Sequence, residues 1–313
     1  MSGSLLNSSA VMLLLAIPST VIWSYSVAAV IFAIGLVVIF VRGDWQREGG
    51  FERLILFGPL FYAASIAAFG TEHFTLTDAI ASIVPSWIPW HHFVALFVGA
   101  CFIAGALSMV TRIQTRLAAS LLALTFFLFV VLMDAPGWVQ DPRDRFALAL
   151  TLRELSFCAG PLALAAALTE PSRSGLARIM ANTARYFIAI TLLVYSFEQF
   201  MHSEHMPGVP LEPLTPRYIY GRVLWTCLAA AVYAVTGVLL LIRKKTRVAA
   251  AWAGLSVLFI ELAVYLPIGV VERASLDNGL NFVLDTLMFC GAVLLVAGAM
   301  PRDLSANRAS ARA

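Results

Sequence analysis

Long apolar runs alternate with short polar segments along the chain. Several runs hold 18 or more residues, enough for a helix to cross a hydrocarbon core about 30 Å thick. Pro18 is expected to separate a short surface segment from the first span, because proline breaks a helix. The pattern predicts an all-α, polytopic membrane helix bundle with about nine spans, at 20–42, 52–72, 91–110, 116–135, 146–168, 184–202, 222–242, 247–266 and 277–299.

Composition strengthens this prediction. Of the 313 residues, 60% are hydrophobic and only 12% are charged, about half the charged fraction of a water-soluble protein. The lipid bilayer is therefore the first expected partner, and no pattern typical of nucleic-acid binding is present. The four cysteines lie in apolar segments without a C-x-x-C pair, so we interpret them as packing residues and not as a redox dithiol.

The basic residues predict the orientation of the chain. Fifteen of them fall in 42–53, 111–116, 169–185, 243–247 and the tail after 300, and five fall in the alternate segments. Because cytoplasmic loops carry the excess of Lys and Arg, the N-terminus is expected outside and the C-terminus in the cytoplasm. We expect the membrane to be the bacterial cytoplasmic (inner) membrane.

The chain also contains an internal repeat. Segments 115–136 and 246–267 align without a gap at an offset of 131 and share Thr, Arg, two Ala, Leu and Pro. The same offset relates Pro85 to Pro216, Glu154 to Asp285 and Gly160 to Gly291. Units with an even number of helices enter the membrane the same way round, which gives parallel repeats. The predicted domains are an N-terminal segment with the first span (1–49), two four-helix repeats (50–170 and 180–300) and a cytoplasmic tail (301–313).

These repeats carry short motifs of a known family. The first contains "EHF", "VPSWIP", "TRLAA" and "LREL", and the second contains "PGVPLEPLTP". The pattern resembles the DoxX family of four-helix integral membrane proteins, here as two tandem copies. The resemblance implies a four-helix bundle and association with respiratory or thiol-linked redox complexes, since founding members are described as quinone-linked oxidoreductase subunits. Quinone is the cofactor that this suggests, with other membrane redox subunits or a periplasmic protein as partners.

Five acidic residues fall inside predicted spans, where charges are costly and usually face a bundle interior or a cavity. Glu72, Glu198 and Glu261 lie near the outer ends of their helices, and Glu154 and Asp285 lie about 12 Å in from the outer ends of theirs. All five histidines fall on the same side of the predicted membrane: His73, His91, His92, His202 and His205. A functional end, if the protein has one, is expected to face outward.

The two repeats differ in how these acids are neutralised. In the first, Arg153 is expected to pair with Glu72 on a neighbouring helix, since adjacent residues such as Arg153 and Glu154 point about 100° apart. These three residues would form a structural ion-pair group. The second repeat has three acids and no base within its spans. It is predicted to hold the working pocket, lined by Glu198, Glu261, Asp285 and His202.

Metal and haem sites are not expected. His202 and His205 are weak candidates for metal ligands, because Pro207 ends the helix soon after them. No C-x-x-C-H motif is present for haem attachment.

Three functions remain open. The first is a membrane subunit of a quinone-linked oxidoreductase complex, with an acidic pocket near the outer face. The second is a non-catalytic scaffold in which the acids pair internally and the outer aromatic loops dock a partner. A small-solute carrier is less favoured, because matching broken helices, a common sign of transport sites, are not evident in the two halves. No residue is assigned a catalytic role.

Overall fold

The computed structural model describes residues 17–170, 174–210 and 213–302, and these form an all-α bundle. Within those ranges, nine helices are long and apolar enough to cross a membrane, and no strand is present beyond an isolated bridge between His205 and Leu214. Most of the predicted surface segment before Pro18 and most of the predicted tail lie outside the described residues.

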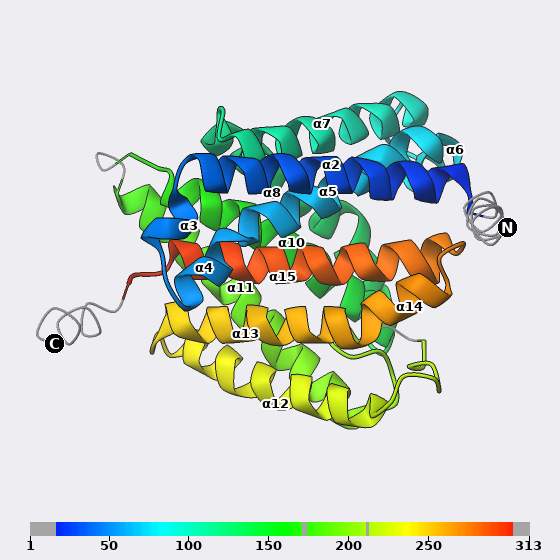
Figure 1. Cartoon of the computed structure of the whole chain (residues 1–313). Coiled ribbons are helices and arrows are strands. Elements are labelled where there is room, and N and C mark those ends of the chain that lie inside the picture. The colour runs from blue at the N-terminus through cyan, green and yellow to red at the C-terminus, as the bar shows by residue number, and fades with distance from the viewer. Residues whose placement is uncertain (1–16, 171–173, 211–212, 303–313) are drawn as a thin grey trace, which may run out of the picture.

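The spans lie side by side across the view of Figure 1. In chain order they are α2 (Ser19–Val41), α4 with α5 (Phe51–Leu56, Gly58–Thr75), α7 (His91–Thr111), α8 with η1 and α9 (Thr115–Phe129, Val130–Asp134, Ala135–Gln140), α10 (Arg145–Ala167), α11 (Ser174–Met201), α12 (Arg222–Leu241), α13 with η3 and α14 (Thr246–Ile260, Glu261–Tyr265, Leu266–Val271), and η4 with α15 (Leu276–Asn281, Phe282–Ala299). The short helices α3 (Asp44–Arg47) and α6 (Thr77–Ile83) lie between spans.

All nine predicted spans are therefore present, with differences at their ends. Helix α11 begins at Ser174, ten residues before the predicted start. The spans expected to end at 135 and 266 continue past Pro136 and Pro267. Both prolines lie in the first turn of a new helix, α9 or α14, where proline is tolerated because the first-turn N–H has no partner within the helix.

A π-helix precedes each of these prolines. The bounds of α8, η1 and α9 recur 131 residues later as the bounds of α13, η3 and α14. Left-handed backbone at Arg112 and Gln114 likewise recurs at Arg243 and Lys245. The offset found in the sequence is therefore also the spacing between two segments of matching backbone geometry.

Helices α5, α10 and α15 form the centre of the bundle. Helix α15 packs against α5, α10 and α13, and α5 and α15 belong to the most buried spans. Small residues permit the close approach, as is typical of helix packing in lipid. A Cβ atom at Gly291 would lie only 2.5 Å from the backbone N of Tyr62 on α5, and one at Gly160 only 2.8 Å from the Cα of Ala292.

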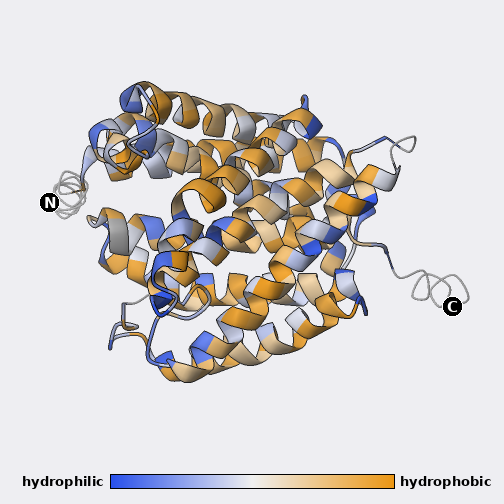
Figure 2. Cartoon of the chain, turned by 180° about the vertical axis from the view of Figure 1, so that it is seen from behind, coloured by the Kyte–Doolittle hydropathy of each residue, from blue (hydrophilic) through white to orange (hydrophobic). Residues whose placement is uncertain are grey.

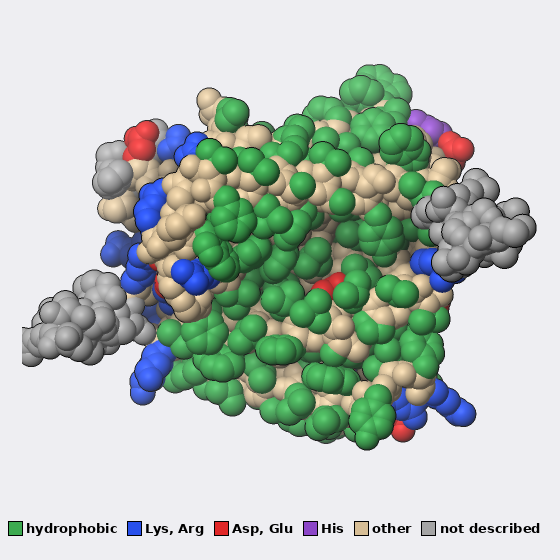
Figure 3. All heavy atoms as spheres, viewed as in Figure 1, with side chains coloured by type: hydrophobic (Ala, Val, Ile, Leu, Met, Phe, Trp, Pro, Cys, Tyr) green, Lys and Arg blue, Asp and Glu red, His purple; other side chains and the backbone are tan. Residues whose placement is uncertain are grey.

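The outside of the bundle suits lipid. Large apolar side chains are exposed along the spans, whereas hydrophilic residues gather mainly at the two ends (Figure 2). Figure 3 shows this hydrophobic face, with Lys and Arg concentrated at the end that carries α3 and α4 and a few acidic atoms visible near its middle. We name the end with α3 and α4 the basic end. The distribution supports a multi-pass protein within a bilayer.

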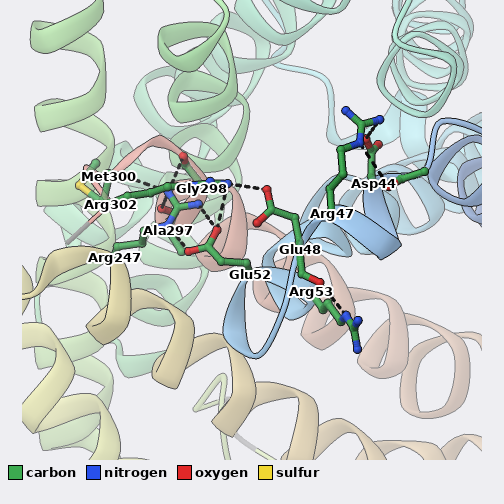
Figure 4. Close-up of polar contacts among 11 residues, drawn as sticks. Asp44, Arg47, Glu48, Glu52, Arg53, Arg247, Ala297, Gly298, Met300 and Arg302 are labelled. Atoms are coloured by element: carbon green, nitrogen blue, oxygen red, sulfur yellow. Dashed lines mark hydrogen bonds and ion pairs between the residues drawn. The ribbon is translucent and has the colours of Figure 1, made fainter. Parts of the chain in front are cut away.

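A buried arginine closes the bundle at the basic end. The guanidinium of Arg247, near the start of α13, pairs with Glu52 on α4 at 2.6 Å (Figure 4). It also donates hydrogen bonds to the carbonyls of Ala297, Gly298 and Met300, at 3.0, 2.9 and 2.8 Å. The last carbonyls of a helix lack the usual N–H partner four residues on, so Arg247 caps this end of α15 and fastens α4, α13 and α15 together.

Candidate functional site

A cavity of about 700 Å³ lies at the end of the bundle away from the basic end. Its walls come from α5, α7, α8 with η1, and α10; α6 and the turn at 84–88 also line it, and η4 and α15 contribute Asn281 and Asp285. Most of the lining is apolar or aromatic, including Val98, Phe102, Phe126, Phe129, Leu132 and Phe157. This size and lining are typical of a site for a small organic ligand.

Arg153 on α10 is the only arginine or lysine on this lining. Its guanidinium pairs with Asp285 on α15 at 2.6 Å and with the neighbouring Glu154 at 3.0 Å. The three side chains are only 20%, 8% and 12% exposed. Removing such charges from water is costly, and their mutual attraction offsets this cost only with good geometry. Arg153 therefore joins α10 to α15 across the boundary between the two predicted repeats.

Several buried polar atoms on the same lining have no hydrogen-bond partner among the described residues. They are Nε of Arg153, Oε2 of Glu154, Oδ2 of Asp134 and Oδ1 of Asn281. Leaving a buried donor or acceptor unpaired costs about 1–3 kcal/mol. Each of these atoms belongs to a residue that lines the cavity but is itself shielded from solvent, so a side-chain rotation must accompany its bonding to a ligand.

Asp134 occupies this position because of the π-helix η1. It is the last residue of η1, directly before the helix α9 that contains Pro136. Single π turns inside α-helices are frequent at functional sites. Tyr265 occupies the matching position in the second repeat, 131 residues later. Its hydroxyl donates a hydrogen bond to the carbonyl of Pro207 at 2.7 Å. Asp134 was not among the predicted site residues, although an acid near the end of a predicted span is the signal that identifies it.

Glu72 and His73 on α5 also line the cavity. The Nδ1 of His73 lies 2.8 Å from the carbonyl of Phe69, so this nitrogen carries the proton in the neutral ring and donates it. That tautomer leaves Nε2 as a hydrogen-bond acceptor. The ring packs edge-on against Phe102 at a centroid distance of 5.3 Å.

The expected ion-pair group is placed differently from the prediction. Arg153 was expected to pair with Glu72, and a pair with the adjacent Glu154 was considered less favourable. In the structure its ion pairs are with Glu154 and Asp285. The flexible side chain of Arg153 reaches both carboxylates because α10 packs against α15. The second repeat was predicted to lack a base that neutralises its acids, and for Asp285 this is wrong, because Arg153 from the first repeat pairs with it.

Glu198 is neutralised in the same way, nearer the helix ends. Its carboxylate, on α11, pairs with Arg145 at the start of α10 at 2.7 Å. His202 follows just beyond, and partial burial lowers its pKa, with Arg145 adding to this effect. None of these three residues lines the cavity.

Glu261 lies apart from both groups. It begins η3, is 5% exposed, and has Tyr25 on α2 and Cys290 on α15 as electrostatic neighbours. Its Oε2 has no hydrogen-bond partner in the part of the chain that the structure describes. The structure therefore does not bring the predicted pocket residues Glu198, Glu261, Asp285 and His202 into one cavity: of the four, only Asp285 lines it.

The two histidines considered as metal ligands are close together. The rings of His202 and His205 have centroids 5.8 Å apart. Among the described residues, no group of three or more His, Cys, Asp or Glu side chains is placed to hold a metal ion.

Comparison with known proteins does not identify the chain. No family model matches it, and comparisons with curated proteins and with solved structures found no similar chain. The resemblance to the DoxX family rests on the short motifs alone and stays a prediction.

Proposed function

We propose that the protein is an integral membrane subunit of a quinone-linked redox complex, and that the cavity binds the quinone head group. The observation that carries this proposal is the set of unpaired polar atoms on an otherwise aromatic and apolar lining. A quinone ring offers flat apolar faces to the phenylalanines and a carbonyl oxygen to Nε–H of Arg153. The hydroxyl groups of the quinol form can donate to the acceptor oxygens of Glu154, Asp134 and Asn281. The hydrophobic tail of the quinone suits entry from the bilayer.

The polar residues have distinct roles in this proposal. Nε–H of Arg153 donates to a carbonyl oxygen of the ring, while Asp285 and Glu154 hold the guanidinium in place. Reduction of a quinone to a quinol consumes two electrons and two protons. A partner redox subunit supplies the electrons, and Asp134 and Glu154 pass on the protons, because carboxyl groups are effective proton donors and acceptors.

The proposal includes the placement of the chain. We place it in the bacterial cytoplasmic membrane with the N-terminus outside, and the fifteen-to-five distribution of basic residues supports this orientation. Two parallel repeats, 50–170 and 180–300, are supported by the recurrence of element bounds at the offset of 131. The cavity then faces outward and is lined mainly by the first repeat, with Asn281 and Asp285 from the second. This proposal replaces the hypothesis that the second repeat alone holds the site.

Exchange of Glu154 for glutamine is expected to weaken binding of the quinol form more than tenfold, because the Glu154 carboxylate accepts a hydrogen bond from a quinol hydroxyl in this proposal. The variant removes the charge that faces the ligand yet leaves the pair between Arg153 and Asp285 intact, and hydrogen bonds to charged groups contribute about 1.5–3 kcal/mol. Glu261→Gln is the matched control, because Glu261 is also a buried carboxyl but lies outside the cavity. Quenching of tryptophan fluorescence by decylubiquinol, titrated anaerobically into protein in detergent micelles, measures both affinities, and decylubiquinone titrated in parallel gives the affinity of the oxidised form.

The outcomes of this titration separate the alternatives. Loss of binding in Glu261→Gln with normal binding in Glu154→Gln would return the site to the second repeat. A wild-type protein that binds no quinone would favour the non-catalytic scaffold instead. The internal pairs Arg153–Asp285 and Arg145–Glu198 are the observation that favours a scaffold. In that case, purification in mild detergent is expected to yield a stoichiometric partner protein that Glu154→Gln still retains.

A further inference from the structure

A second cavity, of about 500 Å³, lies at the basic end of the first unit. It is bounded by α2, the junction of α4 and α5, α7, α8 and the last turn of α10. Its walls are apolar and include Val38, Ile39, Leu60, Met109, Val110 and Leu164. The polar side chains on its lining are those of Arg112, Gln114, Thr115 and Arg116.

Positive charge is in excess at this cavity. The guanidinium of Arg116 is exposed and has no ion-pair or hydrogen-bond partner among the described residues. Arg112 pairs with Asp44 at 2.5 Å, but Asp44 also pairs with Arg47 at 3.2 Å, so one carboxylate serves two arginines. The first turn of α8 contains no acidic residue to complement the positive end of its helix dipole.

The arginine at the position of the second repeat that matches Arg116 is paired with an anion. Arg116 and Arg247 are each the second residue of their helix, α8 or α13, and differ by the offset of 131. Arg247 is buried and pairs with Glu52 (Figure 4). The structure places no carboxylate of the described residues against Arg116. The same side chain therefore meets its anion within the protein in one unit and faces a cavity in the other.

We propose that this cavity binds an anionic phospholipid. The phosphate lies against Arg116 and the N-terminus of α8, and an acyl chain enters the apolar space between α2, α5 and α10. Basic pockets between membrane helices are suited to such head groups. Helix α2, the span outside the predicted repeats, supplies Gly35, Val38 and Ile39 to the wall, which confines the site to the first unit. This site is separate from the proposed quinone site and does not depend on it.

Native mass spectrometry of delipidated protein in detergent tests the proposal. Phosphatidylglycerol and phosphatidylcholine with identical acyl chains are added separately, and the wild type is expected to bind the anionic lipid more tightly. Arg116→Gln should lower the affinity for phosphatidylglycerol about fivefold, since one arginine near an anionic lipid contributes about 1 kcal/mol. Arg116→Lys should retain most of it. Arg178→Gln, an exposed charge on α11 away from the cavity, should bind as the wild type does.

Three results would overturn the proposal. One is unchanged binding of phosphatidylglycerol by Arg116→Gln. Another is an equal loss in Arg178→Gln, which would indicate charge attraction without a specific site. The third is displacement of the lipid by millimolar inorganic phosphate, which would show that the arginines bind free phosphate and that the apolar walls are not used. Because Arg116 is exposed, its substitution should not impair folding, and circular dichroism of the variant checks this.

Discussion

Replacing Arg153 with methionine is expected to lower the free energy of unfolding by about 3–5 kcal/mol, the cost of removing one partner from a buried ion pair. The guanidinium of Arg153 forms ion pairs with Asp285 and Glu154, and all three side chains are largely buried. Without it, two carboxylates lose their counter-charge away from water. Titration from mild detergent into sodium dodecyl sulfate, followed by circular dichroism, measures the loss.

Two further variants separate the buried pair from a general charge effect. Arg145→Met breaks the ion pair with Glu198 near the end of α10, where Arg145 is 29% exposed. A partly solvated pair contributes about 0–1 kcal/mol, so this control should lose little stability. A double variant, Arg153→Met with Asp285→Leu, should recover part of the loss, because an apolar replacement of a buried pair is often tolerated. An Arg153→Met protein as stable as the Arg145→Met protein would contradict the central role of this contact.

Substitution of Gly291 by alanine is expected to destabilise the bundle by about 3 kcal/mol, at the upper end for added volume in a packed core. The new methyl group would lie 2.5 Å from the backbone N of Tyr62 and 3.0 Å from the carbonyl oxygen of Gly58. Backbone atoms cannot rotate away as a side chain can, so α5 and α15 must move apart. The same detergent titration measures the effect.

Gly298→Ala is the matched control in the same helix. A Cβ atom there would have a methyl carbon of Ile55 as its nearest neighbour, at 3.5 Å, which is an ordinary contact. The control should leave stability unchanged or raise it by about 0.5–1 kcal/mol, the advantage of alanine over glycine within a helix. Equal stability of the two variants would mean that the crossing of α5 and α15 is looser than the structure indicates.

The electrostatics of the bundle depend on contacts between the two predicted repeats. Both Arg153 and Arg145 lie on α10, and both bind acids from the second unit. The ion-pair partners predicted within each repeat were therefore wrong, although most of the charged residues themselves were recognised from the sequence. Arg116 at the basic end shows the opposite situation. It has no ion-pair partner among the described residues, whereas Arg247, at the matching position of the second repeat, pairs with Glu52.

The membrane spans were determined by the sequence. Crossing a bilayer requires a long apolar helix with every backbone hydrogen bond made internally, so nine spans could be recognised from local composition. The offset of 131 was equally accessible, because it needs only comparison along the chain. The ends of α9 and α14 were not predicted, since a π-helix followed by a proline in a first turn has no distinctive hydrophobic pattern.

Only the tertiary structure decided which charges meet. A helix fixes the direction of a side chain relative to its own axis, but its rotation toward a neighbour follows from packing of the whole bundle. Asp285 and Glu261 were assigned to one pocket from their depth alone, yet α15 turns Asp285 toward Arg153 while η3 holds Glu261 near α2. Depth in the membrane is encoded locally along the chain, whereas the partner of a buried charge is set by helix contacts between residues far apart in the sequence.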